Sequence, residues 1–453
     1  MQTRLIPSLL ETSDGREADR ILRSCVHCGF CTATCPTYQL LGDELDGPRG
    51  RIYQIKMVLE GEPATRTTQQ HLDRCLTCLN CVTTCPSGVE YQKLVEIGRE
   101  QVEQRVRRPL GERLMRWGLR KVVPYPRRFG PLLRLAQAAR PLVPAKLRGK
   151  VPVALSTPGP ASLASNDHGR QPPRRRRPGR YTRRVLMLDN CVEPALTPAT
   201  VEATVRVLDA LGIEVLQPPG GGCCGAISQH LAAPEEAKGF MRRNIDAWWP
   251  MIEPDADDAD ADADADAGAD VDAPAAEAIL VTASGCGAVV KEYGWLLRDD
   301  PAYAAKAERI SALACDLSEL LTTEDLARLP SPSERGLPRR IAFHPPCTLQ
   351  HGQGLMGRVE ALLRAADFEL TPVRDAHSCC GSAGTYSILQ AELSERLRSD
   401  RLEALQAGEP ALIATANVGC QTHLAAAAGV PVKHWIELFD PQISLASDDS
   451  HST

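Results

Sequence analysis

The chain has 453 residues, of which 43% are hydrophobic and 24% are charged, and its formal net charge is −5. This length predicts two or three domains, and the composition is typical of a globular protein. Charged residues throughout the first 20 positions argue against a secretory signal, and the lack of any run of about eighteen apolar residues argues against a membrane-spanning helix.

The N-terminal region, residues 1–105, combines helical patterning with two similar cysteine motifs. Apolar residues at helical spacing predict helices over residues 16–24, 47–62, 67–75 and 90–104. Between them stand CVHCGFCTATCP, from Cys25 to Pro36, and CLTCLNCVTTCP, from Cys75 to Pro86. The chain has 17 cysteines and no predicted export signal, which favours metal ligation over disulfides because the cytosol keeps thiols reduced.

Both motifs follow C-x2-C-x2-C-x3-C-P, the bacterial ferredoxin run for 4Fe–4S clusters. A zinc site usually takes two C-x2-C pairs separated by a longer loop, so zinc or structural thiols are the weaker alternative. In two-cluster ferredoxins the fourth cysteine of each run ligates the other cluster. The predicted ligands are Cys25, Cys28, Cys31 and Cys85 for the first cluster, and Cys75, Cys78, Cys81 and Cys35 for the second.

Residues 106–182 are predicted to form a basic arm followed by a linker. Residues 105–150 hold fourteen Lys and Arg against one acid, Glu112. Such a stretch either lies on an anionic membrane surface or forms a helical arm that packs on this chain or on a partner. Residues 151–183, rich in Pro, Ser and Arg, are expected to be the linker, and they lack the aromatic interleaving of a nucleic-acid site.

The C-terminal half is predicted to hold two tandem α/β units, residues 183–300 and 339–445, joined by a helical connector over 301–338. Each unit has three apolar strands alternating with helices, which predicts a parallel sheet. These strands are expected at 183–189, 214–219 and 277–285, and at 339–345, 369–373 and 411–417. Residues 254–274 hold nine Asp and no large apolar residue, so they are expected to be a solvated loop insertion in the first unit.

The two units also repeat their cysteines, and we call them CCG units after their Cys-Cys-Gly steps. In each unit a single cysteine precedes the Cys-Cys-Gly step by the same 32 positions. The cysteines are Cys191, Cys223, Cys224 and Cys286 in the first unit, and Cys347, Cys379, Cys380 and Cys420 in the second. They follow predicted strand ends, where open α/β sheets place ligands, so further cluster or metal ligation competes with a buried structural role. Cys315 is left over and is expected to be a helix-core cysteine.

Along nearly its whole length the chain resembles the iron–sulfur subunit family of bacterial glycolate oxidases. The segments that carry the resemblance are CVHCGFCTATCPTYQLLGDELDGPRGRIY, HLDRCLTCLNCVTTCPSGVEY, GGGCCGAISQH, SGCGAVVKEYG, HPPCTLQHGQG, SCCGSAGTY and NVGCQTHL. The resemblance implies a multidomain fold, with a helical dicluster ferredoxin domain followed by two cysteine-rich CCG units.

The resemblance also implies an electron-transfer subunit with no catalytic residues of its own. A partner flavoprotein carrying FAD would oxidise glycolate to glyoxylate, and this chain would relay the electrons through two 4Fe–4S clusters towards a quinone-type acceptor. The sequence itself has no G-x-G-x-x-G after a strand, so no dinucleotide site is predicted on this chain. The expected location is cytoplasmic, peripheral on the inner face of the membrane.

Two alternatives follow from more distant resemblances. One is an electron-transfer subunit for lactate or glycerol-3-phosphate oxidation, and the other is a heterodisulfide-reductase-like enzyme. In heterodisulfide reductases each CCG unit ends in C-x2-C, whereas the second position here is Val289 or His423. This departure makes disulfide reduction the weaker alternative and leaves His423 as either a substitute ligand or an ordinary histidine.

Overall fold

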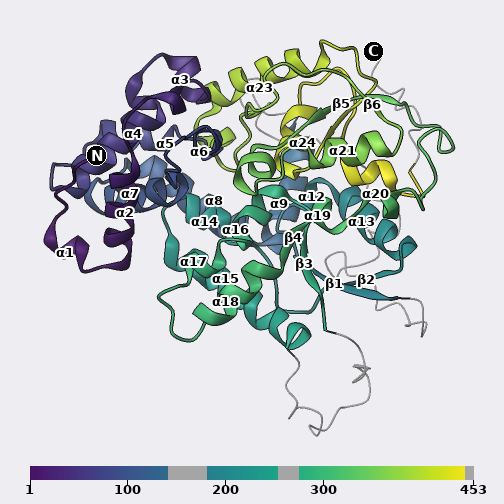
Figure 1. Ribbon diagram of the computed structural model, residues 1–453, viewed down its shortest axis with the longest axis horizontal. Helices are drawn as coiled ribbons and strands as arrows, with labels where there is room; N and C mark the ends of the chain where they lie inside the picture. Colours follow the sequence, from purple (N-terminus) through teal and green to yellow (C-terminus); the bar gives the residue numbers. More distant parts are fainter. Residues whose placement is uncertain (141–180, 254–274, 444–453) are drawn as a thin grey trace, which may run out of the picture.

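The computed structural model describes residues 1–140, 181–253 and 275–443. Figure 1 shows a helical region at the N-terminal end of the molecule beside two α/β units, each built around a parallel sheet. Among the described residues, no helix is both long and apolar enough to cross a membrane. The linker, the acidic insertion and the last ten residues fall outside the described ranges, so their predictions stay untested.

Short helices connected by the cysteine loops make up the N-terminal region. Its core lies between α4 and α7, where Ile55, Leu94 and Val95 are fully buried. Gly98 on α7 lets the two helices approach, because a Cβ there would lie 2.6 Å from the Ile55 side chain. The elements are α1 (Pro7–Leu10), α2 (Ser13–Ser24), η1 (Phe30–Thr32), α3 (Pro36–Leu41), η2 (Glu44–Asp46), α4 (Pro48–Leu59), α5 (Arg66–Asp73), α6 (Asn80–Thr83) and α7 (Tyr91–Arg105).

The basic arm forms two helices, α8 (Leu110–Val122) and α9 (Pro126–Ala138). Their inner side packs on the first CCG unit: Arg120 and Lys121 pair with Glu236, and the Tyr125 ring lies 5.6 Å from the Phe240 ring. The arm therefore packs on this chain, one of the arrangements expected from the sequence.

The first CCG unit is a four-stranded parallel sheet in the order β2-β1-β3-β4. The strands are short and apolar on both faces, because helices cover both sides of the sheet. The strands are β1 (Arg183–Met187), β2 (Ile213–Leu216), β3 (Ala278–Val281) and β4 (Ala314–Asp316). The helices are α12 (Glu193–Leu196), α13 (Pro198–Ala210), α14 (Ala226–His230), α15 (Pro234–Ile252), α16 (Ser284–Val290), α17 (Tyr293–Leu296) and α18 (Ala304–Leu313).

The second CCG unit repeats this architecture with the order β6-β5-β7-β8, again parallel. Its strands are β5 (Arg340–His344), β6 (Glu369–Leu370), β7 (Ile413–Thr415) and β8 (Val432–His434). The remaining elements are α19 (Leu317–Leu320), α20 (Thr323–Leu326), η5 (Thr348–Gly352), α21 (Arg358–Ala365), α22 (Tyr386–Leu389), α23 (Ala391–Gln406), α24 (Val418–Ala425) and η6 (Trp435–Phe439). One continuous core, which includes Leu280 and Trp435, joins the two units.

The region expected to be a helical connector differs from that expectation. It contains β4, which pairs with β3 and completes the first sheet at Asp316. Cys315 therefore lies on a strand, half-buried, and the prediction of a helix-core cysteine is wrong. Three residues are too few to show the alternating apolar pattern of a strand in the sequence. This strand forms because it pairs with β3.

Candidate iron–sulfur sites

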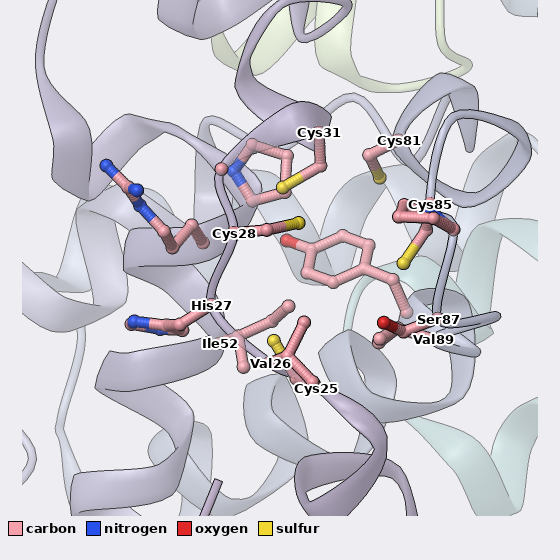
Figure 2. A pocket seen from close by; sticks show the side chains of 15 residues that line it. Cys25, Val26, His27, Cys28, Cys31, Ile52, Cys81, Cys85, Ser87 and Val89 are labelled. Carbon is pink, nitrogen blue, oxygen red and sulfur yellow. The ribbon is translucent and has the colours of Figure 1, made fainter.

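Five of the predicted ligands line one cavity in the N-terminal region. Four of them, Cys25, Cys28, Cys31 and Cys85, are the predicted ligands of one cluster, and we call them the outer cysteine set. Cys81 also lines this cavity, which is partly open to solvent. Figure 2 shows their sulfur atoms around a common space. Cys28 is exposed and Cys25 is buried, while Cys31 and Cys85 are intermediate. Cys85, from the second motif, thus joins the first three cysteines of the first motif.

The other four, Cys35, Cys75, Cys78 and Cys81, form the inner cysteine set. All four are buried, and Cys35 is close enough to Cys78 and Cys81 to interact with them electrostatically. The crossed assignment of the cluster ligands stays a prediction. Tyr91 links the two sites, because its ring lines the outer cavity and its hydroxyl donates to Cys75 Sγ at 3.6 Å.

The local backbone explains how each motif turns its thiols inward. Both loops place residues with left-handed φ at matching positions: His27 at 59° and Gly29 at 88° in the first motif, and Thr77 at 53° and Leu79 at 60° in the second. Such conformations cost energy for residues other than glycine and persist where the surroundings enforce them. Here they wrap each loop so that three thiols face one point.

Positive charge lies close to part of the inner cysteine set. The Arg51 side chain is 1% exposed and approaches Cys35 Sγ at 4.0 Å, while it also pairs with the fully buried Asp46 at 3.4 Å. The Thr77 backbone N–H donates to Cys75 Sγ at 3.4 Å. Burial raises the pKa of Cys75, but the charges of Arg51 and Arg99 outweigh it and the pKa is lowered overall. Convergent thiols with N–H and cationic neighbours fit an anionic 4Fe–4S cluster.

The thiols of the first CCG unit also converge. Cys223 contacts both Cys191 and Cys224, and Cys224 contacts Cys286, so the four thiols form a continuous row. All of them follow the carboxyl ends of strands or open the next helix, as the sequence predicted. The basic arm lies over this row: Tyr125 packs in one cluster with Cys191, Cys223 and Phe240.

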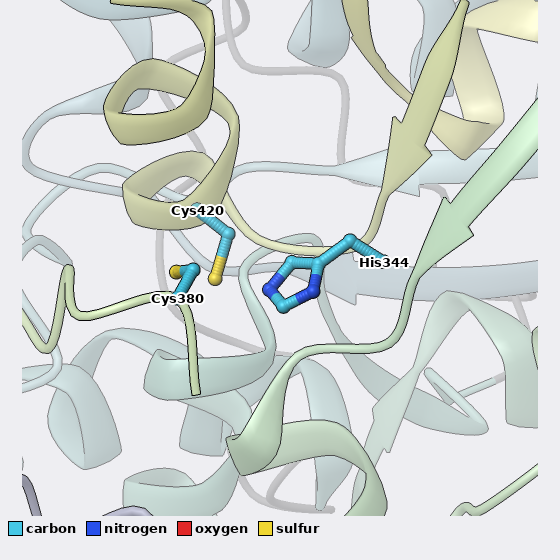
Figure 3. Close-up of side chains that lie close together, drawn as sticks. All are labelled: His344, Cys380 and Cys420. Carbon is cyan, nitrogen blue, oxygen red and sulfur yellow. The ribbon is translucent and has the colours of Figure 1, made fainter. Parts of the chain in front are cut away.

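The second CCG unit has the same row and one further group. Cys347 and Cys379 sulfurs lie 3.8 Å apart, Cys379 contacts Cys380, and Cys380 contacts Cys420. His344 joins this end, because its ring and the thiols of Cys380 and Cys420 have donor atoms within 4.8 Å of one another. Figure 3 shows the His344 ring facing these two sulfurs.

His423 lies apart from this group, with its Nε2 3.2 Å from Ser394 Oγ. Burial lowers the pKa of His423 to about 4. The sequence left His423 as either a substitute ligand or an ordinary histidine, whereas the histidine whose ring lies beside the thiols is His344. A signal was present: His344 stands three positions before Cys347, where the first unit has Leu188 before Cys191.

The inner cysteine set lies next to the second CCG unit. Cys78 packs in one cluster with Cys347 and Cys379. On the other side, Glu96 of α7 receives a hydrogen bond from Gln229 at 3.0 Å and lies 3.7 Å from His230 of the first unit. Burial, followed by the Glu292 charge, raises the pKa of Glu96 to about 8. The N-terminal region thus contacts both units.

Comparison with known proteins agrees with this layout. The family model for the 4Fe-4S dicluster domain matches residues 21–89, and that for the cysteine-rich domain matches residues 185–291 and 341–425. The chain is 52% identical, over 97% of its length and 98% of the relative's, to the glycolate oxidase iron-sulfur subunit of Escherichia coli (strain K12). The chain belongs to the glycolate oxidase iron–sulfur subunit family.

More distant members of the comparison share the same parts. The probable glycolate oxidase iron-sulfur subunit of Bacillus subtilis (strain 168) is 30% identical over 88% of this chain and 87% of its own. Lactate utilization protein A of Bacillus licheniformis is 25% identical over 54% of this chain and 92% of its own. As an iron–sulfur subunit of this family, the chain is an electron-transfer component of an oxidoreductase.

Proposed function

We propose that this subunit carries electrons from a partner flavoprotein that oxidises glycolate to glyoxylate. The observation that carries the proposal is the arrangement of the two cysteine sets, one at the surface and one buried behind it. Bound 4Fe–4S clusters supply one-electron transfer. The outer set, Cys25, Cys28, Cys31 and Cys85, would hold one cluster, and the inner set, Cys35, Cys75, Cys78 and Cys81, the other.

The division of labour follows from electron counting. Glycolate loses two electrons and two protons to become glyoxylate, and a flavin takes them as a hydride and a proton. A one-electron centre cannot accept a hydride, so FAD on the partner is the group that converts the pair into single electrons. Two single transfers through this subunit then reduce a quinone-type acceptor, which takes up two protons. No residue of this chain is assigned to glycolate chemistry.

The outer cysteine set is the proposed point of contact with a redox partner. Cys28 is exposed, and the flanking Val26 and Phe30 side chains are 67% and 62% exposed. Exposed apolar side chains around a reactive group are typical of docking surfaces. A partner that covers them would bring its own redox group close to the outer set.

The basic arm is the proposed contact with the inner face of the cell membrane. Leu110, Leu114 and Trp117 on α8 are 77%, 64% and 53% exposed, and Arg113 on α8 and Arg127 on α9 are exposed as well. Neither arginine has an ion-pair partner among the described residues. An exposed face with apolar and cationic side chains suits an anionic lipid surface, which would bring the subunit near a membrane quinone.

The cysteines of the two CCG units are proposed as ligands of further iron–sulfur or metal centres. Support comes from the two continuous rows of thiols, Cys191, Cys223, Cys224 and Cys286, and Cys347, Cys379, Cys380 and Cys420. Thiols gathered this closely repel one another once ionised, and a bound cation removes that repulsion.

The test is to assay the subunit alone and together with its flavoprotein partner. Alone, the anaerobically purified chain should show no glycolate dehydrogenase activity. With the partner, glycolate should be oxidised in preference to lactate and glycerol 3-phosphate. A preference for lactate or glycerol 3-phosphate would contradict the assignment of substrate, and glycolate oxidation by the chain alone would contradict the division of labour.

A second test addresses the crossed ligands. Cys35→Ser should damage the cluster that is otherwise held by Cys75, Cys78 and Cys81 and should leave the outer cluster in place. Electron paramagnetic resonance of the reduced chain would separate the two signals. Loss of the outer signal alone would contradict the crossed assignment, and stoichiometric zinc without sulfide would contradict cluster binding altogether.

A further inference from the structure

His344 brings an unused polar atom into the second CCG unit. The residue is 0% exposed, and its buried Nε2 has no hydrogen-bond partner among the described residues. In Figure 3 the ring is turned so that a nitrogen faces the sulfurs of Cys380 and Cys420. A buried polar atom without a partner is costly, so its presence indicates a group that the protein binds at this place.

The other ring nitrogen defines which tautomer His344 adopts. Arg401 Nε lies 3.1 Å from His344 Nδ1. A guanidinium has only donors, so Nδ1 must be the acceptor, and the neutral ring then carries its hydrogen on Nε2. His344 therefore presents an N–H to the sulfurs, and this makes it a hydrogen-bond donor there instead of a ligand.

Arg401 adds a buried positive charge at the same place. The residue is 2% exposed, and it donates to the carbonyl oxygens of Arg374 and Asp375 at 3.2 and 2.7 Å. It has no ion pair among the described residues, and its buried Nη2 has no hydrogen-bond partner there. A buried charge is costly unless negative groups nearby compensate it. Cys379, Cys380 and Cys420, together with the carboxylate of Asp375, are close enough to interact with it electrostatically.

The first CCG unit supplies the matched comparison. Gly225 and Gly381, the last residues of the two Cys-Cys-Gly steps, face Ala237 and Ser394, which are therefore equivalent helix positions. Seven residues further along, the first unit has Asn244 where the second has Arg401. Asn244 is neutral and its amide is satisfied by Gly222, Cys223 and Tyr293. Leu188 takes the place of His344, so the first unit lacks this histidine and the arginine behind it. An asparagine donates to the last thiol in both units, from Asn190 to Cys286 and from Asn417 to Cys420, so the two units differ in the His344 and Arg401 pair.

We propose that His344 and Arg401 are positioning residues for an anionic, thiolate-bound iron–sulfur cluster in the second CCG unit. His344 donates its Nε2–H to a sulfur of that centre, and Arg401 holds the ring and offsets the negative charge. The inference rests on the proposed ligand role of Cys347, Cys379, Cys380 and Cys420. Hydrogen bonds and positive charge favour the more negative, reduced state of a cluster, so the pair raises its reduction potential.

The position of this centre gives the proposal a functional consequence. Cys78 of the inner set packs against Cys347 and Cys379 of the second unit, so electrons from the inner cluster have a short route to it. A raised potential makes the second unit a favourable next acceptor. The first unit, without the pair, would hold a centre of lower potential or a metal ion without redox chemistry.

The experiment uses the full chain, purified anaerobically, and needs neither partner nor glycolate. Iron and sulfide are counted in the wild type and in a Cys380→Ser, Cys420→Ser double variant, which identifies the content and signal of the second unit. Midpoint potentials are then measured for His344→Leu and Arg401→Asn, which install the first unit's residues, and for His344→Gln, which keeps an N–H donor. His423→Leu is the matched control for loss of a buried histidine in the same unit.

We expect the double variant to contain less iron and sulfide than the wild type, because it loses the centre of the second unit, while both dicluster signals persist. His344→Leu and Arg401→Asn should retain that iron and shift its potential downward, His344→Gln should restore part of the shift, and His423→Leu should not move it. Pulsed resonance with nitrogen-15 histidine should show a weak coupling that disappears in His344→Leu.

Several results would overturn the proposal. One is that the wild type contains no more iron and sulfide than the double variant, and another is that the second unit contains only zinc. A third is a strong coupling from a directly bound histidine nitrogen. A fourth is that correctly folded His344→Leu and Arg401→Asn leave the potential unchanged. Intact dicluster signals serve as the folding control. None of these readouts depends on which substrate the partner oxidises, so a failure of this proposal does not test the assignment to glycolate oxidation.

Discussion

Arg51 offers the sharpest test of how the fold tunes the inner cluster. Its guanidinium is buried beside Cys35 and Cys75, and it also pairs with Asp46. A 4Fe–4S cluster becomes more negative by one charge when it is reduced, and a nearby cation stabilises that state. Replacing Arg51 by Gln should therefore lower the reduction potential of the inner cluster.

The magnitude follows from the 4.0 Å between Arg51 Nη1 and Cys35 Sγ. Two unit charges at that distance interact by about 4 kcal/mol at an effective dielectric constant near 20. At 59 mV for each tenfold change in a one-electron equilibrium, this sets a ceiling of roughly 180 mV. The cluster charge is spread beyond Cys35 and Asp46 offsets part of the cation, so we expect a shift of roughly 50 to 150 mV.

The assay is an anaerobic redox titration followed by electron paramagnetic resonance, with iron content as the check on assembly. Arg108→Gln is the matched control, since Arg108 is also buried but pairs with Asp73 and Glu103 and donates to no sulfur among the described residues. The reasoning would be refuted if Arg51→Gln left the inner potential unchanged in an assembled chain. A shift confined to the outer cluster would refute the placement of Cys35.

Two further predictions concern stability. Gly381→Ala should lower the free energy of unfolding by roughly 2 to 4 kcal/mol in a denaturant titration, because an Ala there combines a left-handed backbone with a Cβ 2.6 Å from the Ser394 carbonyl oxygen. Gly384→Ala, which has a left-handed backbone but open space around its Cβ, should lower it by only about 1 to 2 kcal/mol. Equal losses would show that the helix contact is unimportant. The pKa of Glu96 is raised from 4.5 to about 8, chiefly by burial, so the folded state binds the extra proton and the free energy of unfolding should fall as pH rises across that window. Glu96→Gln should flatten this dependence, and a slope as steep as in the wild type would contradict it.

The sequence predicted the parts of the fold that depend on local patterns. Apolar runs at β1, β3, β5 and β7 and the repeated spacing of the Cys-Cys-Gly steps are enough to predict two parallel units with their cysteines at strand ends. The ferredoxin run likewise predicted a dicluster domain, which the family model over residues 21–89 confirms, while the crossed ligands stay a prediction. These features are local in sequence or repeated within it.

Other features depend on contacts that no local pattern contains. The strand β4 forms because β3 offers an open edge, so the segment around Cys315 could not be distinguished from a helix. His344 and Arg401 are 57 residues apart in the sequence and form a hydrogen bond in the fold. Neither segment by itself indicates this contact. The basic arm is a similar case, because its inner side packs on Glu236 and Phe240 of the first CCG unit, far away in the sequence.

The central claim is that this subunit relays electrons and does not oxidise the substrate. Rapid mixing of glycolate with the assembled complex of partner flavoprotein and Cys28→Ala tests it most directly, with flavin bleaching and acceptor reduction followed separately. The account predicts that the flavin is bleached nearly as fast as in the wild-type complex, while electrons fail to reach a quinone or dye that draws on the clusters. Loss of flavin bleaching in an assembled variant complex, with acceptor reduction maintained, would contradict it.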